Sequence, residues 1–125
     1  MSPNPWMSTH LRSPLQVETD THAGGVVFAD MWVENLLLQP DGTVRYWSES
    51  IMRSLNQQPE FDCAGRWEQK GPHLVIHCTL WPDKEVQMKC YCRWDEEAGL
   101  LIGDMYWSND TSQQQMGRVF APVAA

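Results

Sequence analysis

From Gly25 onward the chain consists of short apolar-rich runs with alternating side chains, separated by turn signals rich in glycine, proline and aspartate. Alternation with a period of two is typical of strands, and closely spaced turns join such strands into antiparallel meanders. No strand–helix–strand alternation is present, so we expect no parallel sheet. The expected strands cover residues 26–38, 43–49, 62–68, 73–81, 85–94, 100–107 and 113–120.

These strands define the predicted fold class, which is mainly β. We expect an antiparallel meander of about seven strands that forms a closed or half-closed barrel. The connection at 49–61 has apolar residues at near-helical spacing and is the one place where a short helical turn fits. Two alternatives stay open for the interior, since small barrels either fill it with side chains or enclose a ligand.

The first 24 residues differ from the rest because they are polar and carry three prolines. We expect residues 1–24 to form a partly mobile N-terminal arm with a short strand at 15–19, and residues 25–125 to form a single barrel domain. The start of the chain shows no basic run followed by an apolar stretch. We therefore predict no secretory signal and a cytoplasmic protein.

Composition excludes several function classes. The net charge of −7 with only nine scattered Lys and Arg residues argues against nucleic-acid binding, which depends on neutralising phosphates. No apolar run approaches the roughly 18 residues of a membrane helix, so we expect no membrane association. The four cysteines are expected to be buried thiols rather than two disulfides, because no secretory signal is visible. They are Cys63, Cys78, Cys90 and Cys92.

Turn chemistry predicts the strand register. Residues 39–43 suit a three-residue hairpin loop in which Gly42 adopts a positive φ. This loop sets Leu38 opposite Val44, Leu36 opposite Tyr46 and Glu34 opposite Ser48. A four-residue loop at 69–72 sets Trp67 opposite Leu74, Gly65 opposite Ile76 and Cys63 opposite Cys78. A turn at 82–84 sets Cys78 beside Met88, Ile76 beside Cys90 and Leu74 beside Cys92.

The turn at 96–99 leaves two alternatives for Asp104. With four loop residues, Met105 and Trp107 face inward and Asp104 points outward beside Tyr91. With three, Asp104 lies inside next to Cys90. We favour the first, because burying an unpaired carboxylate is costly.

Three segments carry a family resemblance. The run Leu36–Val44 (LLLQPDGTV), then Gly65-Arg66-Trp67, then Gly71–Ile76 (GPHLVI) resembles small lipocalin-like, or calycin-type, barrel domains. The resemblance covers roughly residues 26–120. It implies a closed or half-closed antiparallel barrel around a small apolar ligand, and it implies no catalytic residue.

The two ends of the expected barrel differ in character. One end is wholly apolar and is made by Leu38, Val44, Trp67, Leu74, Cys92 and Trp94. The other end lies beside the 49–61 connection and combines apolar walls with a few polar groups, as small-molecule sites do. The candidate ligand-binding residues at this end are Trp32, Glu34, Tyr46, Ser48, Met88 and Trp107.

We therefore predict non-enzymatic binding of a small apolar or aromatic molecule in a barrel cavity. One alternative is a small isomerase, cyclase or hydrolase that uses Glu34 as acid or base. Another is a homodimeric interaction module without a ligand. It would use an exposed aromatic surface made by Trp47, Tyr91 and Trp81.

No catalytic residue, metal ligand or cofactor is predicted, because nucleophile–base signatures and phosphate-cradling loops are absent. His73 and His77 lie about 13 Å apart along one strand face, so they cannot chelate one metal together and are expected in solvent. Asp104 and Arg118 are further candidate polar residues, with a mutual ion pair as the alternative.

Overall fold

The protein is an all-β barrel. The computed structural model describes residues 6–22, 25–50, 61–81, 85–109 and 113–123, and no helix occurs in these ranges. The described strands are β1 (His10–Arg12), β2 (Gln16–His22), β3 (Gly25–Leu38), β4 (Thr43–Ser50), β5 (Asp62–Lys70), β6 (His73–Trp81), β7 (Val86–Asp95), β8 (Leu100–Ser108) and β9 (Gln113–Pro122). The described part of the chain contains no helix that could span a membrane.

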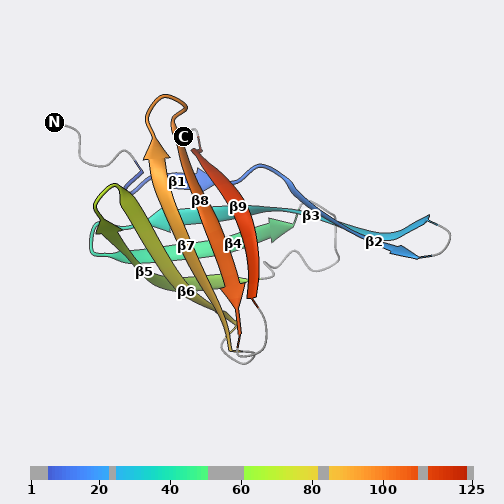
Figure 1. Cartoon of the computed structure of the whole chain (residues 1–125). Coiled ribbons are helices and arrows are strands. Elements are labelled where there is room, and N and C mark those ends of the chain that lie inside the picture. Colours follow the sequence, from blue (N-terminus) through green and yellow to red (C-terminus); the bar gives the residue numbers. More distant parts are fainter. Residues whose placement is uncertain (1–5, 23–24, 51–60, 82–84, 110–112, 124–125) are drawn as a thin grey trace.

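Eight of these strands close the barrel. Strands β3 to β9 form a continuous antiparallel meander, and β1 lies between β9 and β3 to complete the ring (Figure 1). Strand β2 pairs with the first part of β3, and this hairpin extends away from the barrel. The predicted antiparallel barrel is therefore confirmed, and the seven strands expected between residues 26 and 120 have limits within two residues of those observed. The short strand expected at 15–19 is the longer β2, and β1 was not expected.

Two of the predicted hairpin registers are confirmed. Leu38 pairs with Val44, Leu36 with Tyr46 and Glu34 with Ser48 across β3 and β4. Cys78 pairs with Met88, Ile76 with Cys90 and Leu74 with Cys92 across β6 and β7. Across β7 and β8, Tyr91 pairs with Asp104, whose side chain is exposed, so the favoured outward orientation of Asp104 is also confirmed.

The predicted register of the β5–β6 hairpin is wrong by two residues. Trp67 pairs with Ile76 rather than Leu74, and Gly65 pairs with Cys78 rather than Ile76. Cys63 consequently does not face Cys78 directly but pairs with Tyr46 of β4. The cause is a tighter turn. Gly71 takes a positive φ of 63° in a two-residue loop, so positions 69 and 70 stay in the strand.

The N-terminal segment contributes to the barrel. β1 closes the ring, and Leu11 on β1 is fully buried. Trp6, which precedes β1, is 4% exposed. Trp6 packs edge-on against Trp67 at the apolar end, with ring centroids 4.9 Å apart. Mobility of residues 1–24 and a domain limit at residue 24 stay predictions. Of the 49–61 segment where a helical turn was expected, residues 51–60 lie outside the described residues, 49 and 50 belong to β4, and Phe61 directly precedes β5.

Two glycines allow neighbouring strands to approach on the inner face. A Cβ atom at Gly65 would overlap the carbonyl oxygen of His77, and one at Gly103 would lie 2.5 Å from the Cβ of Cys92. Glycine is therefore required at both positions, because any side chain would force the strands apart. Around them the interior is packed with buried Leu, Ile, Met, Cys and aromatic side chains.

Candidate functional site

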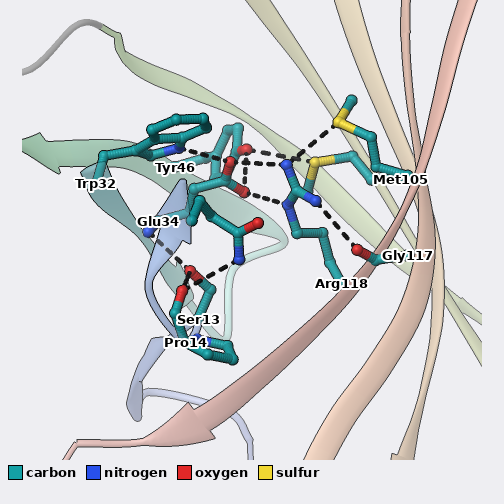
Figure 2. Close-up of polar contacts among 10 residues, drawn as sticks. Ser13, Pro14, Trp32, Glu34, Tyr46, Met105, Gly117 and Arg118 are labelled. Atoms are coloured by element: carbon teal, nitrogen blue, oxygen red, sulfur yellow. Dashed lines mark hydrogen bonds and ion pairs between the residues drawn. The ribbon is translucent and has the colours of Figure 1, made fainter. Parts of the chain in front are cut away.

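Glu34 is the central residue of a polar group inside the barrel. It lies in the last third of β3, four residues before Leu38, where strand alternation turns its side chain inward, and none of its surface is exposed. Its carboxylate accepts a hydrogen bond from the Tyr46 hydroxyl at 2.7 Å and another from the Trp32 Nε1 at 3.2 Å. Figure 2 shows the carboxylate between these two side chains and Arg118.

Arg118 holds the carboxylate from the opposite side. Its Nε donates to Oε1 of Glu34 at 2.8 Å and its Nη2 donates to Oε2 at 3.1 Å (Figure 2). Two parallel bonds of this kind are the strong, orientation-specific form of a carboxylate–guanidinium pair. Arg118 is 8% exposed, so Glu34 and Arg118 are the two charged residues among the buried positions that the structure describes.

The ion pair lies close to the place where the strand that pairs with β3 changes from β1 to β2. β1 pairs with β9 through Leu11 and Arg12, and beyond Arg12 the chain leaves β9 to become β2. In the same place the Ser13 backbone N–H donates to the Glu34 carbonyl, and the Glu34 N–H donates to the Ser13 hydroxyl. The Glu34–Arg118 bond therefore joins β3 to β9 where β1 no longer lies between them.

Tyr46 completes the polar group and stays a hydrogen-bond donor. Burial, reinforced by the negative charge of Glu34, holds the pKa of the Tyr46 hydroxyl well above its usual range. The phenol is therefore neutral at physiological pH. Its oxygen also lies 3.3 Å from the sulfur of Met105, and the Arg118 Nη2 lies 3.2 Å from the sulfur of Met116. Soft apolar side chains thus surround the ion pair.

An aromatic cluster adjoins this polar group. Phe61 packs against Tyr46 at 4.6 Å and edge-on against Trp107 at 5.6 Å between ring centroids. Trp81 lies edge-on to both Phe61 and Trp107. The indole Nε1 of Trp107 is buried and has no hydrogen-bond partner among the residues that the structure describes. A buried donor without an acceptor costs about 1–3 kcal/mol.

The structure places the six candidate ligand-binding residues in two connected groups. Trp32, Glu34 and Tyr46 form the polar group, and Trp107 belongs to the aromatic cluster. Met88 is fully buried and pairs with Trp107 across β7 and β8. Ser48 is buried too, and its hydroxyl accepts a hydrogen bond from the Phe61 N–H, which fixes Phe61 beside the cluster.

Phe61 and Trp81 belong to this site but were not among the candidate ligand-binding residues, and Arg118 was only a further candidate. The alternative ion pair between Asp104 and Arg118 is wrong, because Asp104 is exposed and Arg118 binds Glu34. Alternation along β9 could have placed Arg118 inside, but its partner depends on closure of the barrel. Phe61 directly precedes β5 and falls outside the expected strand of 62–68.

Trp81 also differs from its expected position. A β-bulge between Thr79 and Trp81 adds one residue to β6, and such a bulge redirects the side chains that follow it. Trp81 consequently packs against the core rather than joining Trp47 and Tyr91 on an outer surface. The proposed aromatic surface of those three residues is therefore not formed. His73 and His77 are both exposed, as expected.

A second buried polar group lies on the opposite face of β3. Asn35 is fully buried, and its Oδ1 accepts from Arg12 at 3.0 Å and lies 2.7 Å from the ring nitrogen of His10. Its amide nitrogen donates to Glu49, which also pairs with Arg12. These contacts fasten β1 to β3 and β4, so the group has a structural explanation.

The described residues contain no group of three or more His, Cys, Asp or Glu side chains able to hold a metal ion. All four cysteines lie in described strands and are buried and free. No family model, curated protein or solved structure matches this chain.

Proposed function

We propose that this protein binds a small apolar or aromatic molecule, without catalysing a reaction, at the barrel end that carries Trp107 and Glu34. The aromatic cluster of Phe61, Trp81 and Trp107 would contact the body of the molecule. The polar group around Glu34 and Arg118 would form the floor of the site. Convergent polar groups within apolar walls are typical of small-molecule sites.

The observation that carries the proposal is the buried ion pair. Moving a carboxylate and a guanidinium out of water is expensive, and well-packed apolar residues in their place are often neutral or stabilising. Glu34 is fully buried and Arg118 nearly so, among Tyr46, Met105 and Met116. A departure of this kind from an apolar core is expected where function requires it. The pair is therefore better explained by a binding site than by stability alone.

The Trp107 indole supports a more specific ligand. Its buried N–H has no acceptor among the described residues, and its ring edges adjoin Phe61 and Trp81. An oxygen atom of a ligand would satisfy that donor and remove its desolvation cost. We infer a neutral molecule with an apolar or aromatic body and one acceptor, such as a ketone or a phenol.

Binding is favoured over acid–base catalysis by the state of Glu34. Both carboxylate oxygens already accept hydrogen bonds from Arg118, and Tyr46 and Trp32 each donate one more. A general base needs a free lone pair within reach of the substrate proton. Glu34 is arranged instead as the counter-ion that holds Arg118. The homodimer alternative loses support because Trp81 packs inward.

Two further parts of the proposal concern family and compartment. The closed antiparallel barrel supports a lipocalin-like module, and four free buried thiols support a cytoplasmic location, where thiols stay reduced. The proposed partner is accordingly a small molecule rather than nucleic acid or a membrane. The chain's negative charge is consistent with that choice.

The test is a screen of aromatic ketones and phenols by intrinsic tryptophan fluorescence and thermal unfolding. A ligand at a hundredfold excess over its Kd should stabilise the native state by about 2.7 kcal/mol. Trp107→Phe keeps an aromatic ring but removes the N–H, so it should weaken binding by about three- to tenfold.

Trp94→Phe is the matched control, because Trp94 lies on the same strand pair at the opposite end of the barrel. It should bind like the unmodified protein. If no compound raises the unfolding temperature, or if the two variants respond equally, the proposed site at the Trp107 end is wrong.

A further inference from the structure

A row of basic side chains crosses the outer face of three adjacent strands. Arg66 on β5 pairs with His77 on β6, and His77 pairs with Lys89 on β7. Side chains directly opposite one another on neighbouring strands lie about 4.5–5.5 Å apart at Cβ, so these three side chains are neighbours on the outer face. The row therefore places the Arg66 and Lys89 side chains on the same outer face, one on either side of His77.

These three side chains have no acidic ion-pair partner among the described residues. By contrast, Arg45 binds Asp62, Arg12 binds Glu49 and Lys70 lies 4.0 Å from Glu68. Asp41, at the turn near Arg66, has its carboxylate engaged by the backbone N–H and hydroxyl of Thr43. Besides these bonds from Thr43, which lower its pKa most, Arg66 also acts on Asp41 at longer range, because its positive charge helps to lower the pKa of that carboxyl. The three side chains of the row thus stay outside the ion pairs of the described residues, on a chain of net charge −7.

The row borders a hollow of about 490 Å³ on the barrel exterior. Lys70, Val75 and Tyr91 contribute to its other walls, and Glu68 is its one acidic lining residue. Tyr91 is 42% exposed, which is unusual among the large apolar and aromatic side chains of this protein. The Lys89 Nζ lies over the Tyr91 ring, 5.6 Å from its centre, and the Tyr106 ring packs against Tyr91 at 5.9 Å between centroids, so a cation and an exposed aromatic ring occur together.

We propose that this hollow binds a small multivalent anion that carries both phosphate groups and a planar ring. The phosphate groups would contact the basic side chains, and the ring would lie against Tyr91. Arginine and lysine are the side chains that recognise phosphate most often, and three of them line the hollow. An exposed tyrosine ring offers a surface on which a planar group stacks. Because these side chains point outward from the barrel, the site is separate from the one proposed around Trp107.

The test is isothermal titration with pyrophosphate at constant ionic strength. The unmodified protein should bind it, and Arg66→Gln or Lys89→Gln should each weaken binding by about tenfold. Arg93→Gln is the matched control, because Arg93 is exposed on the same strand as Lys89 and does not line the hollow. The control and Trp107→Phe should both bind normally. Equal losses in the Lys89 and Arg93 variants, or no binding at all, would overturn the proposal.

The proposed contact between the ligand ring and Tyr91 is tested by comparing two ligands. A nucleoside diphosphate should bind more tightly than pyrophosphate, and Tyr91→Leu should remove that difference while leaving pyrophosphate binding intact. Unchanged thermal unfolding of all these surface variants would show that each one is folded. A nucleoside diphosphate that binds no better than pyrophosphate would overturn the contact with Tyr91.

Discussion

Glu34 and Arg118 stand 84 positions apart in the chain, yet the two bonds between their side chains measure 2.8 Å and 3.1 Å. The contact joins β3 to β9, the strands on either side of β1. It is therefore made only when the barrel closes. The same contact places two charges in an apolar interior, so it has to be considered both as a structural bond and as part of a site.

Removing one member of this pair should cost more stability than removing both. Arg118→Met leaves the Glu34 carboxylate buried without its counter-ion, and we expect a loss of about 3–5 kcal/mol in the free energy of unfolding. Glu34→Leu combined with Arg118→Met removes both charges and should lose clearly less than that single variant. Urea unfolding measures both values. The Glu34→Leu single variant, measured in the same way, completes the cycle. A double variant as unstable as the sum of the two single variants would show that the two charges are not coupled.

The second prediction concerns the glycines of the inner face. Gly103→Ala would place a Cβ 2.5 Å from Cys92 Cβ and 2.7 Å from the Tyr91 carbonyl, so the strands would have to separate. We expect a loss of about 1–3 kcal/mol or more from overpacking. Gly117→Ala is the matched control, because nothing lies within 4 Å of its Cβ position. In thermal unfolding, the Gly117→Ala variant should have nearly the same unfolding temperature as the unmodified protein. If Gly103→Ala and Gly117→Ala lower the unfolding temperature equally, the close approach of β7 and β8 is contradicted.

The strands and the first hairpin were accessible from sequence because alternation and the Pro40-Asp41-Gly42 turn each act locally. The β5–β6 register was not, because the two-residue turn at Gly71 and a four-residue loop place the same side chains inside. A shift by two residues leaves the faces unchanged, so apolar patterning does not distinguish the two registers. Local signals therefore predict which residues face inward more reliably than they predict which residues are neighbours.

The candidate site shows the same limit. Glu34 and Tyr46 were expected together because they lie on one hairpin. Arg118 joins them only through closure by β1, a strand of three residues that is too short to produce a periodic pattern. Trp81 differs from its expected position because a bulge between Thr79 and Trp81 adds one residue to β6, and strand alternation alone does not predict a bulge.

The third prediction tests the apolar end. Trp67 packs against Trp6, and its Nε1 donates to the Gln39 carbonyl at 2.7 Å. Trp67→Ala should lower the free energy of unfolding by about 3–5 kcal/mol, since a large aromatic side chain leaves a packed position. Trp67→Phe keeps a six-membered ring but loses the pyrrole part of the indole together with the hydrogen bond, so its loss should be smaller than that of the Ala variant. An Ala variant that unfolds at the same urea concentration as the unmodified protein would show that Trp67 contributes no packing.

The last prediction concerns the thiols. All four cysteines are free and buried, so alkylation in denaturant without prior reduction should modify four sites. In the native protein they should not react equally. A hydrogen bond from Cys78 lowers the pKa of the Cys63 thiol, whereas the bond to Cys63, followed by burial, raises the pKa of Cys78. A hydrogen bond with Cys92, again followed by burial, raises the pKa of Cys90.

Because the thiolate is the reacting form, Cys63 should be labelled first near neutral pH. Cys78 and Cys90 should stay unmodified as the pH is raised to about 9, near the ordinary thiol pKa. Mass spectrometry of peptides after timed iodoacetamide treatment measures the order, and Cys63→Ser should abolish the early label. Fewer than four sites in denaturant would reveal a disulfide. Early labelling of Cys90 instead of Cys63 would contradict the hydrogen-bonded thiol pairs.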